Sequence, residues 1–250
     1  MKLKKIVIVL LLLGFVCSVP GYRQIVETAG RLTYSLTLVV DAGHGGMDGG
    51  AQAADGTTEQ QINLKIAEAI EKEAEKYDIK TVLTRKSESG LYEEGKQDGK
   101  WTKMGDMRER KRIIEETRPD VTVSIHLNSY TADTSVCGPQ VFYSEEGRKE
   151  LALENRGLAE QVRQSLRETL GERADRAVMS KNDIYLFRNI DEHMILIECG
   201  FLSNPAEAAD LKREEYQQKI ASSVVDAVCE YFNIPCKKTE KREVVDSRTK

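Results

Sequence analysis

An apolar, β-branched run that breaks into a glycine-rich loop most constrains what this chain can fold into. Residues 36–41 have the composition of a buried strand, and the loop that follows carries His44 among glycines. Glycine lets a backbone turn sharply and approach a ligand or metal closely. A dinucleotide-binding loop is excluded, because the G-x-G-x-x-G spacing that starts at Gly43 requires glycine where Asp48 stands.

Segments typical of strands alternate with segments typical of helices along the rest of the chain. Short apolar runs predict strands at residues 36–41, 79–84, 121–126, 139–143, 184–188 and 194–197. Apolar stripes with helical spacing predict helices at residues 58–77 and 147–170. A strongly charged segment stopped by Pro119 predicts a helix at residues 106–117, and a last helix is predicted at residues 214–232. Strands that are apolar on both faces need helices on both sides. We therefore expect an α/β fold, a three-layer α/β/α sandwich with a mostly parallel, twisted sheet of about six strands.

The chain divides into four predicted parts. Basic residues, a short apolar run and a Pro-Gly stop make residues 1–21 a signal peptide or an N-terminal membrane anchor. Residues 22–35 form a connector, residues 36–233 one folded domain, and residues 234–250 a charged, flexible tail. Inside the domain, residues 86–105 have no periodicity and hold the only tryptophan, Trp101. This long loop is either a solvated excursion or a binding segment.

The charge pattern excludes one class of partner. The formal net charge is −4 and the isoelectric point is near 5.6, and basic residues alternate with acidic ones along the chain. Nucleic-acid-binding domains gather their basic residues on one face. We therefore expect no nucleic acid partner.

Two of the three histidines follow predicted strands. His44 lies in the glycine loop and His126 ends the strand at 121–126, so both fall at the carboxyl edge of the sheet, where open α/β sheets bind ligands. Two neutral imidazoles and one carboxylate form a zinc site with an open fourth position. Glu59, at the start of the first helix, is only slightly preferred as the third ligand over three competitors, Asp41, Asp48 and Asp55.

A further carboxylate, Glu198, directly follows the apolar strand at 194–197. An ionised carboxylate is costly there unless it has a cationic partner or a catalytic task. A structural salt bridge and a catalytic role are therefore the two readings of Glu198.

Four blocks of sequence resemble the zinc-dependent N-acetylmuramoyl-L-alanine amidases of the Amidase_3 type. They are Asp-Ala-Gly-His-Gly-Gly with Asp-Gly-Gly-Ala at 41–51, Glu59, Ser-Ile-His-Leu-Asn-Ser at 124–129, and Ile-Glu-Cys-Gly-Phe-Leu-Ser-Asn at 197–204. The blocks occur in the order of the family and near its spacings, and the likeness covers residues 36–232. Because no wall-binding repeat is attached, the chain is most similar to the spore-cortex amidases of endospore formers.

The resemblance implies a phosphorylase/hydrolase-like, zinc-exopeptidase-like fold with one catalytic Zn²⁺. It implies His44, Glu59 and His126 as metal ligands and Glu198 as the catalytic acid/base. The implied reaction is hydrolysis of the amide between N-acetylmuramic acid and the L-alanine of the stem peptide in peptidoglycan. In the spore cortex this step prepares the muramic lactam used in germination.

Several residues depart from the family pattern or extend it. Ala42 stands where the family often has proline, and His193 stands near a position where proline is common. His193 is interpreted as the residue before the last strand, although a further metal or substrate role is open. Three residues are candidate substrate contacts: Arg85, Arg188 and Asn128. Both arginines lie at predicted strand ends, where a structural salt bridge would account for them equally well.

The predicted location is extracytoplasmic, in the cell wall or anchored to the membrane through residues 1–21. The expected partners are peptidoglycan and an activating exported protein or lipoprotein. Two other functions remain open on the residues alone. One is a zinc peptidase that cuts within the stem peptide, and the other is a catalytically weak module that binds peptidoglycan or a partner.

Overall fold

The computed structural model describes residues 35–91, 96–97 and 100–235. The predicted signal or anchor, residues 22–34 of the predicted connector and residues 236–250 of the predicted tail lie outside the described residues. Within the part that is described, no helix is both long enough and apolar enough to cross a membrane.

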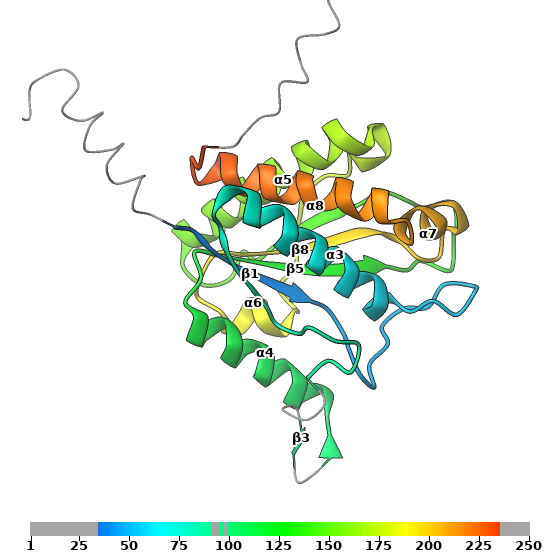
Figure 1. The fold of residues 1–250 in the computed structure, drawn as a ribbon, viewed down its shortest axis with the longest axis horizontal. Coiled ribbons are helices and arrows are strands. Elements are labelled where there is room, and N and C mark those ends of the chain that lie inside the picture. Colours follow the sequence, from blue (N-terminus) through cyan, green and yellow to red (C-terminus); the bar gives the residue numbers. More distant parts are fainter. Residues whose placement is uncertain (1–34, 92–95, 98–99, 236–250) are drawn as a thin grey trace, which may run out of the picture. The chain divides into compact units, whose positions relative to one another are not determined.

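The described residues form a central six-stranded sheet with the strand order β2-β1-β5-β8-β6-β7 (Figure 1). β2, β1, β5 and β8 run parallel to one another, β6 runs antiparallel to β8, and β7 runs parallel to β6. This confirms the mostly parallel sheet, in which four neighbouring strands end at the same edge. The strands are β1 (Thr37–Ala42), β2 (Lys80–Leu83), β5 (Val121–Asn128), β6 (Gln140–Tyr143), β7 (Met179–Ser180) and β8 (Met194–Phe201).

Helices cover both faces of the sheet, which confirms the three predicted layers (Figure 1). On one face lie α3 (Glu59–Ala74), α5 (Lys149–Leu170) and α8 (Glu214–Tyr231); on the other lie α4 (Lys103–Thr117) and α6 (Tyr185–Asn189). Neighbouring residues of β1 alternate between two apolar clusters. Val40 belongs to the larger cluster with α3 and α8, and Val39 belongs to the smaller cluster with Ile114 of α4. Burial on both faces accounts for the continuous apolar strands.

Residues 184–188 lie in a helical segment, so the strand that we predicted there is wrong. Leu186 and Phe187 of α6 are buried in the smaller apolar cluster, which also contains Phe142 of β6. The short strand β7 occupies the sheet edge instead, with Met179 paired to Phe142. A five-residue apolar run fits either a strand or a turn of helix, and packing decides between them.

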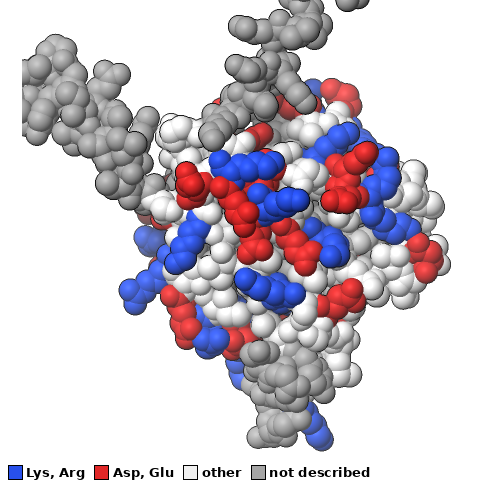
Figure 2. Space-filling view, in the orientation of Figure 1, with Lys and Arg blue, Asp and Glu red and all other residues white. Residues whose placement is uncertain are grey.

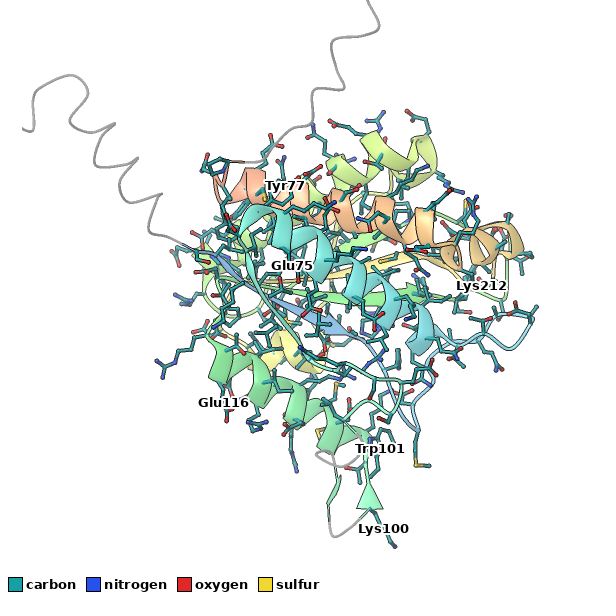
Figure 3. The ribbon with its side chains drawn as sticks, viewed as in Figure 1. Glu75, Tyr77, Lys100, Trp101, Glu116 and Lys212 are labelled. Atoms are coloured by element: carbon teal, nitrogen blue, oxygen red, sulfur yellow. The ribbon has the colours of Figure 1, made fainter. Side chains whose placement is uncertain are left out.

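The long segment at 86–105 contains a small hairpin, β3 (Lys96–Gln97) and β4 (Lys100–Trp101). Figure 3 labels Lys100 and Trp101 on this hairpin, next to the start of α4. α4 begins at Lys103, three residues earlier than predicted, because the Thr102 hydroxyl accepts a hydrogen bond from the N–H of Gly105 at 2.9 Å. The remaining elements are η1 (Glu75–Tyr77), η2 (Glu172–Ala174) and α7 (Pro205–Leu211).

Basic and acidic side chains are interspersed on the face of the molecule in Figure 2. Many form pairs along a helix, such as Lys65 with Glu68 on α3. On this face the mixed pattern gives no extended field of one sign.

Candidate metal centre

Three polar side chains converge at the carboxyl edge of the sheet. His44 follows β1, His126 lies near the end of β5, and Glu59 is the first residue of α3. One ligand atom from each of the three lies within 4.8 Å of the others, an arrangement that could hold a metal ion. The His44 and His126 rings meet edge to face, with 4.9 Å between their centroids.

The loop after β1 holds His44 in an unusual backbone conformation. Its φ is +61°, in the left-handed region that non-glycine residues seldom adopt, and a tight turn follows in which Gly45 and Asp48 exchange backbone hydrogen bonds. The Asp48 carboxylate lies 3.0 Å from Nδ1 of His44, while Nε2 lies 3.2 Å from Oε1 of Glu59. Asp48 thus orients the imidazole, and the other ring nitrogen faces the ligand cluster.

Glu59 is buried at the centre of the cluster. Its Oε1 lies 3.0 Å from Nδ1 of His126 and accepts the N–H of Leu127 at 2.9 Å, while its Oε2 accepts the N–H of Ala51 at 2.9 Å. Burial raises the pKa of Glu59, but hydrogen bonds with His126 and His44 outweigh burial and bring the pKa well below its usual range. The lowered pKa favours the ionised carboxylate, the form in which a glutamate can bind a metal.

Two glycines leave the space that this cluster occupies. A Cβ on Gly43 would lie 2.3 Å from Cε1 of His126, and a Cβ on Gly50 would lie 2.6 Å from Oε2 of Glu59. Two imidazoles and one ionised carboxylate are the donor set of open zinc sites. The residues present therefore fit a zinc ion with a free fourth position.

Glu198 stands beside this cluster on the neighbouring strand. It is paired with His126 in the parallel register of β5 and β8, so both side chains leave the same face of the sheet. Its Oε2 is buried and makes no hydrogen bond to the described residues. Burial raises the pKa of Glu198, and the nearby His126 only partly offsets this effect. A carboxyl group in this state can hold and transfer a proton.

The model of the N-acetylmuramoyl-L-alanine amidase family matches residues 38–230. The chain belongs to this family. The germination-specific N-acetylmuramoyl-L-alanine amidase of Bacillus subtilis is 33% identical over 195 residues, which cover 78% of this chain and 79% of that protein.

Solved structures of other amidases have the same fold. The CwlD amidase of Clostridioides difficile, solved in complex with the GerS lipoprotein, is 32% identical with a TM-score of 0.72, covering 80% of this chain and 100% of that one. AmiC2 of Nostoc punctiforme is 25% identical with a TM-score of 0.64, covering 79% of this chain and 97% of that one. These structures support the three-layer architecture of this amidase.

A buried charge network beneath the His44 loop was missed in the sequence. Arg110 of α4 donates from Nη1 to Asp41 of β1 at 2.6 Å and from Nε to Asp106 at 2.7 Å, and its Nη2 donates to the carbonyl of His44. Burial raises the pKa of Asp41, but Arg110 and Ser124 outweigh it and lower the pKa to about 2. The only signal was a helix stripe of Asp106, Arg110 and Ile114 at four-residue spacing.

Arg85 lies beneath the same loop in this amidase. It is buried, and its guanidinium donates to the backbone carbonyls of Ala42, Gly43, Gln60 and Ser87. These bonds give Arg85 a structural place in the loop that holds His44. The role of Arg85 as a substrate contact stays a prediction.

The other predicted contacts lie in different places. Asn128 ends β5 at the carboxyl edge, and its Oδ1 accepts the N–H of Ser129 at 2.8 Å. Arg188 lies on α6, not at a strand end, and donates to the carbonyl of Asn182 at 2.8 Å. His193 precedes β8 at the opposite edge of the sheet, with Nδ1 3.4 Å from Asn155. His193 is therefore outside the metal cluster.

Proposed function

We propose that this amidase cleaves the amide between N-acetylmuramic acid and the L-alanine of the stem peptide, with one zinc ion held by His44, Glu59 and His126. The observation that supports these roles is the convergence of the three side chains within 4.8 Å, with Glu198 in register beside His126. Membership of the amidase family supports the choice of bond.

In the proposed reaction, the residues around the metal cluster have separate roles. A bound zinc ion supplies a Lewis acid that polarises the amide carbonyl and lowers the pKa of water to about 7. Asp48 keeps His44 oriented through its 3.0 Å contact with Nδ1. Glu198 accepts a proton from the attacking water and returns it to the leaving amine of L-alanine, a transfer that its raised pKa favours.

We infer that the substrate is peptidoglycan outside the cytoplasm, in the spore cortex. The relative from Bacillus subtilis is named as germination-specific, and the CwlD structure contains the GerS lipoprotein. A partner of that kind, an exported protein or lipoprotein, fits the N-terminal signal or anchor that the sequence predicts.

Digestion of purified peptidoglycan tests the proposal. The protein, loaded with zinc or treated with a chelator, is incubated with cortex and with vegetative peptidoglycan, and the products are identified by mass spectrometry. We expect intact stem peptides with a free L-alanine amine, only in the presence of zinc and with more product from cortex. Shorter peptide fragments would indicate a zinc peptidase, and the absence of products would indicate a binding module.

A further inference from the structure

Two basic side chains on the β6–β7 side of Glu198, Arg176 and Lys181, form no ion pair with a carboxylate of the described residues. Other basic residues around the carboxyl edge are paired. Lys103 lies 3.1 Å from Asp48, and Lys212 forms an ion pair with Asp55. Cations without acidic partners next to a reacting carboxylate are candidates for binding an anionic substrate group.

Arg176 is placed by the strand that pairs with Glu198. Gln140 of β6 lies directly opposite Glu198 in the antiparallel register, so the two side chains leave the same face of the sheet. Gln140 Oε1 accepts hydrogen bonds from Nε and Nη2 of Arg176 at 3.3 and 3.2 Å. The guanidinium also lies 5.2 Å from the ring centroid of Phe201, at the end of β8. Its Nη1 also donates to the carbonyl of Cys137 at 3.4 Å, so the groups in contact with the guanidinium are neutral and it forms no ion pair with the described residues.

Lys181 lies further along the same face. It follows β7, its N–H donates to the carbonyl of Tyr143 at 2.9 Å, and its exposed Nζ lies 5.5 Å from the ring centroid of Phe142. Phe142 is paired with Leu196, two residues before Glu198, so all three side chains share one face. Burial raises the pKa of Glu198, and the positive charge of Lys181 partly offsets this effect. The Lys181 ammonium is therefore close enough to act electrostatically on the Glu198 carboxylate.

We propose that Arg176 and Lys181 form a carboxylate-binding site for an acidic stem peptide, on the β6–β7 side of Glu198. The assignment rests on the proposed amidase function, because hydrolysis at Glu198 would place the peptide beside this pair. Arg176 presents a planar guanidinium held in position by Gln140, and Lys181 presents a mobile point charge. The pair would favour peptides with free carboxylates over peptides in which these groups are amidated.

A cavity near the carboxyl edge of the sheet differs from this cationic site in the charge of its lining. It has a volume of about 320 Å³, and its lining includes Gln52, Ser129, Leu202 and Lys212. Figure 3 labels Lys212, whose ammonium is paired with Asp55 and so is compensated. Hydroxyl, amide and apolar groups suit a neutral ligand such as a sugar or an uncharged side chain. In this proposal the cavity binds a neutral part of the substrate, and Arg176 and Lys181 bind its carboxylates.

Binding of the product peptide tests this site without turnover. The zinc-loaded protein is titrated with L-alanyl-D-glutamate and with its diamide by isothermal calorimetry, at low and at physiological salt. The variants are Lys181→Glu, Arg176→Gln and the control Lys219→Glu, which reverses an exposed charge on α8 in the opposite helix layer. Circular dichroism checks that each variant is folded.

We expect the wild-type protein to bind the diacid more tightly than the diamide, with the difference reduced by salt. Lys181→Glu and Arg176→Gln should weaken diacid binding by roughly fivefold, as for partly solvated ion pairs, and leave diamide binding unchanged. Lys219→Glu should change neither. Equal affinity for the two peptides, or an equal loss for both in the variants, would overturn the site. These readouts need no hydrolysis, so they are separate from the peptidoglycan digestion.

Discussion

Arg110 and Asp41 form an ion pair in the interior, with 2.6 Å between Nη1 and Oδ1, beneath the loop that holds His44. Arg110 is fully buried, and it reaches both the carboxylate of Asp41 and the carbonyl of His44. One guanidinium thus joins α4, the end of β1 and a proposed metal ligand. The same side chain therefore stabilises the end of β1 and holds the loop that positions His44.

Replacement of Arg110 by methionine should be strongly destabilising. The substitution would leave Asp41 and Asp106 as buried charges without a cation, so we expect a loss of about 3–5 kcal/mol in the free energy of unfolding. Urea denaturation followed by circular dichroism measures this loss. Arg112→Met is the matched control, because Arg112 lies two residues away on α4, is itself exposed, and pairs with the partly buried Glu109 and the exposed Glu116. Similar midpoints for the two variants would contradict a role for the buried pair.

Acid should weaken the folded state through Asp41. Its pKa is lowered from 3.8 to about 2 in the folded protein, so its ionised form stabilises the fold above about pH 4. That contribution, about 2 kcal/mol, disappears as the pH falls from 4 to 2. Urea denaturation at pH values across this range should show a flatter pH dependence for Asp41→Asn than for the wild-type protein. Identical slopes would assign the acid sensitivity to other carboxylates.

Gly43→Ala should disable the site although it adds one methyl group. The new Cβ would lie between 2.3 and 2.7 Å from three atoms of the His126 ring, which must move away. A displacement of a ligand by about 1 Å costs on the order of 100-fold in rate, so activity and zinc affinity should both fall. Gly49→Ala is the control, because its Cβ would make only an ordinary 3.4 Å contact with Thr58. Equal activity of the two variants would contradict this argument.

Two further variants should separate metal binding from proton transfer. His126→Ala removes a proposed ligand, so the protein should lose zinc and activity together. Glu198→Gln keeps the ligands but removes the proton acceptor, so zinc should stay stoichiometric while turnover falls by at least about 100-fold. Metal analysis by mass spectrometry and peptidoglycan digestion measure the two properties. Normal activity and zinc content in His126→Ala would show that the metal lies elsewhere.

The convergence of the site was predictable in part. Strand ends marked His44, His126 and Glu198, because parallel strands share a carboxyl edge. The spacing alone barely separated Glu59 from the aspartates, since a loop of unknown path joins the two segments. The structure gives each acid a distinct environment. Glu59 lies between two imidazoles, and Asp48 lies behind His44. Asp41 pairs with Arg110, and Asp55 pairs with Lys212.

The fold was predictable where an apolar pattern with helical spacing extends over several turns. Helices α3, α5 and α8 have stripes of several turns, and each was expected close to its observed place. The errors fall on short segments. Residues 184–188 contain aromatic and apolar side chains that suit a strand, and in the structure Leu186 and Phe187 of the helix are buried in one apolar cluster with Phe142. Such contacts join residues far apart in sequence, so no local pattern contains them.

β8 is the last strand of the sequence, yet it lies between β5 and β6 in the middle of the sheet. A nascent chain that has emerged only as far as His193 already contains His44, Glu59 and His126 but lacks Glu198 and the strand that joins the two halves of the sheet. The two halves of the sheet can therefore join only when β8 is present. A chain cut before β8 would keep the three proposed metal ligands but lack the proposed proton acceptor, so we expect it to be inactive.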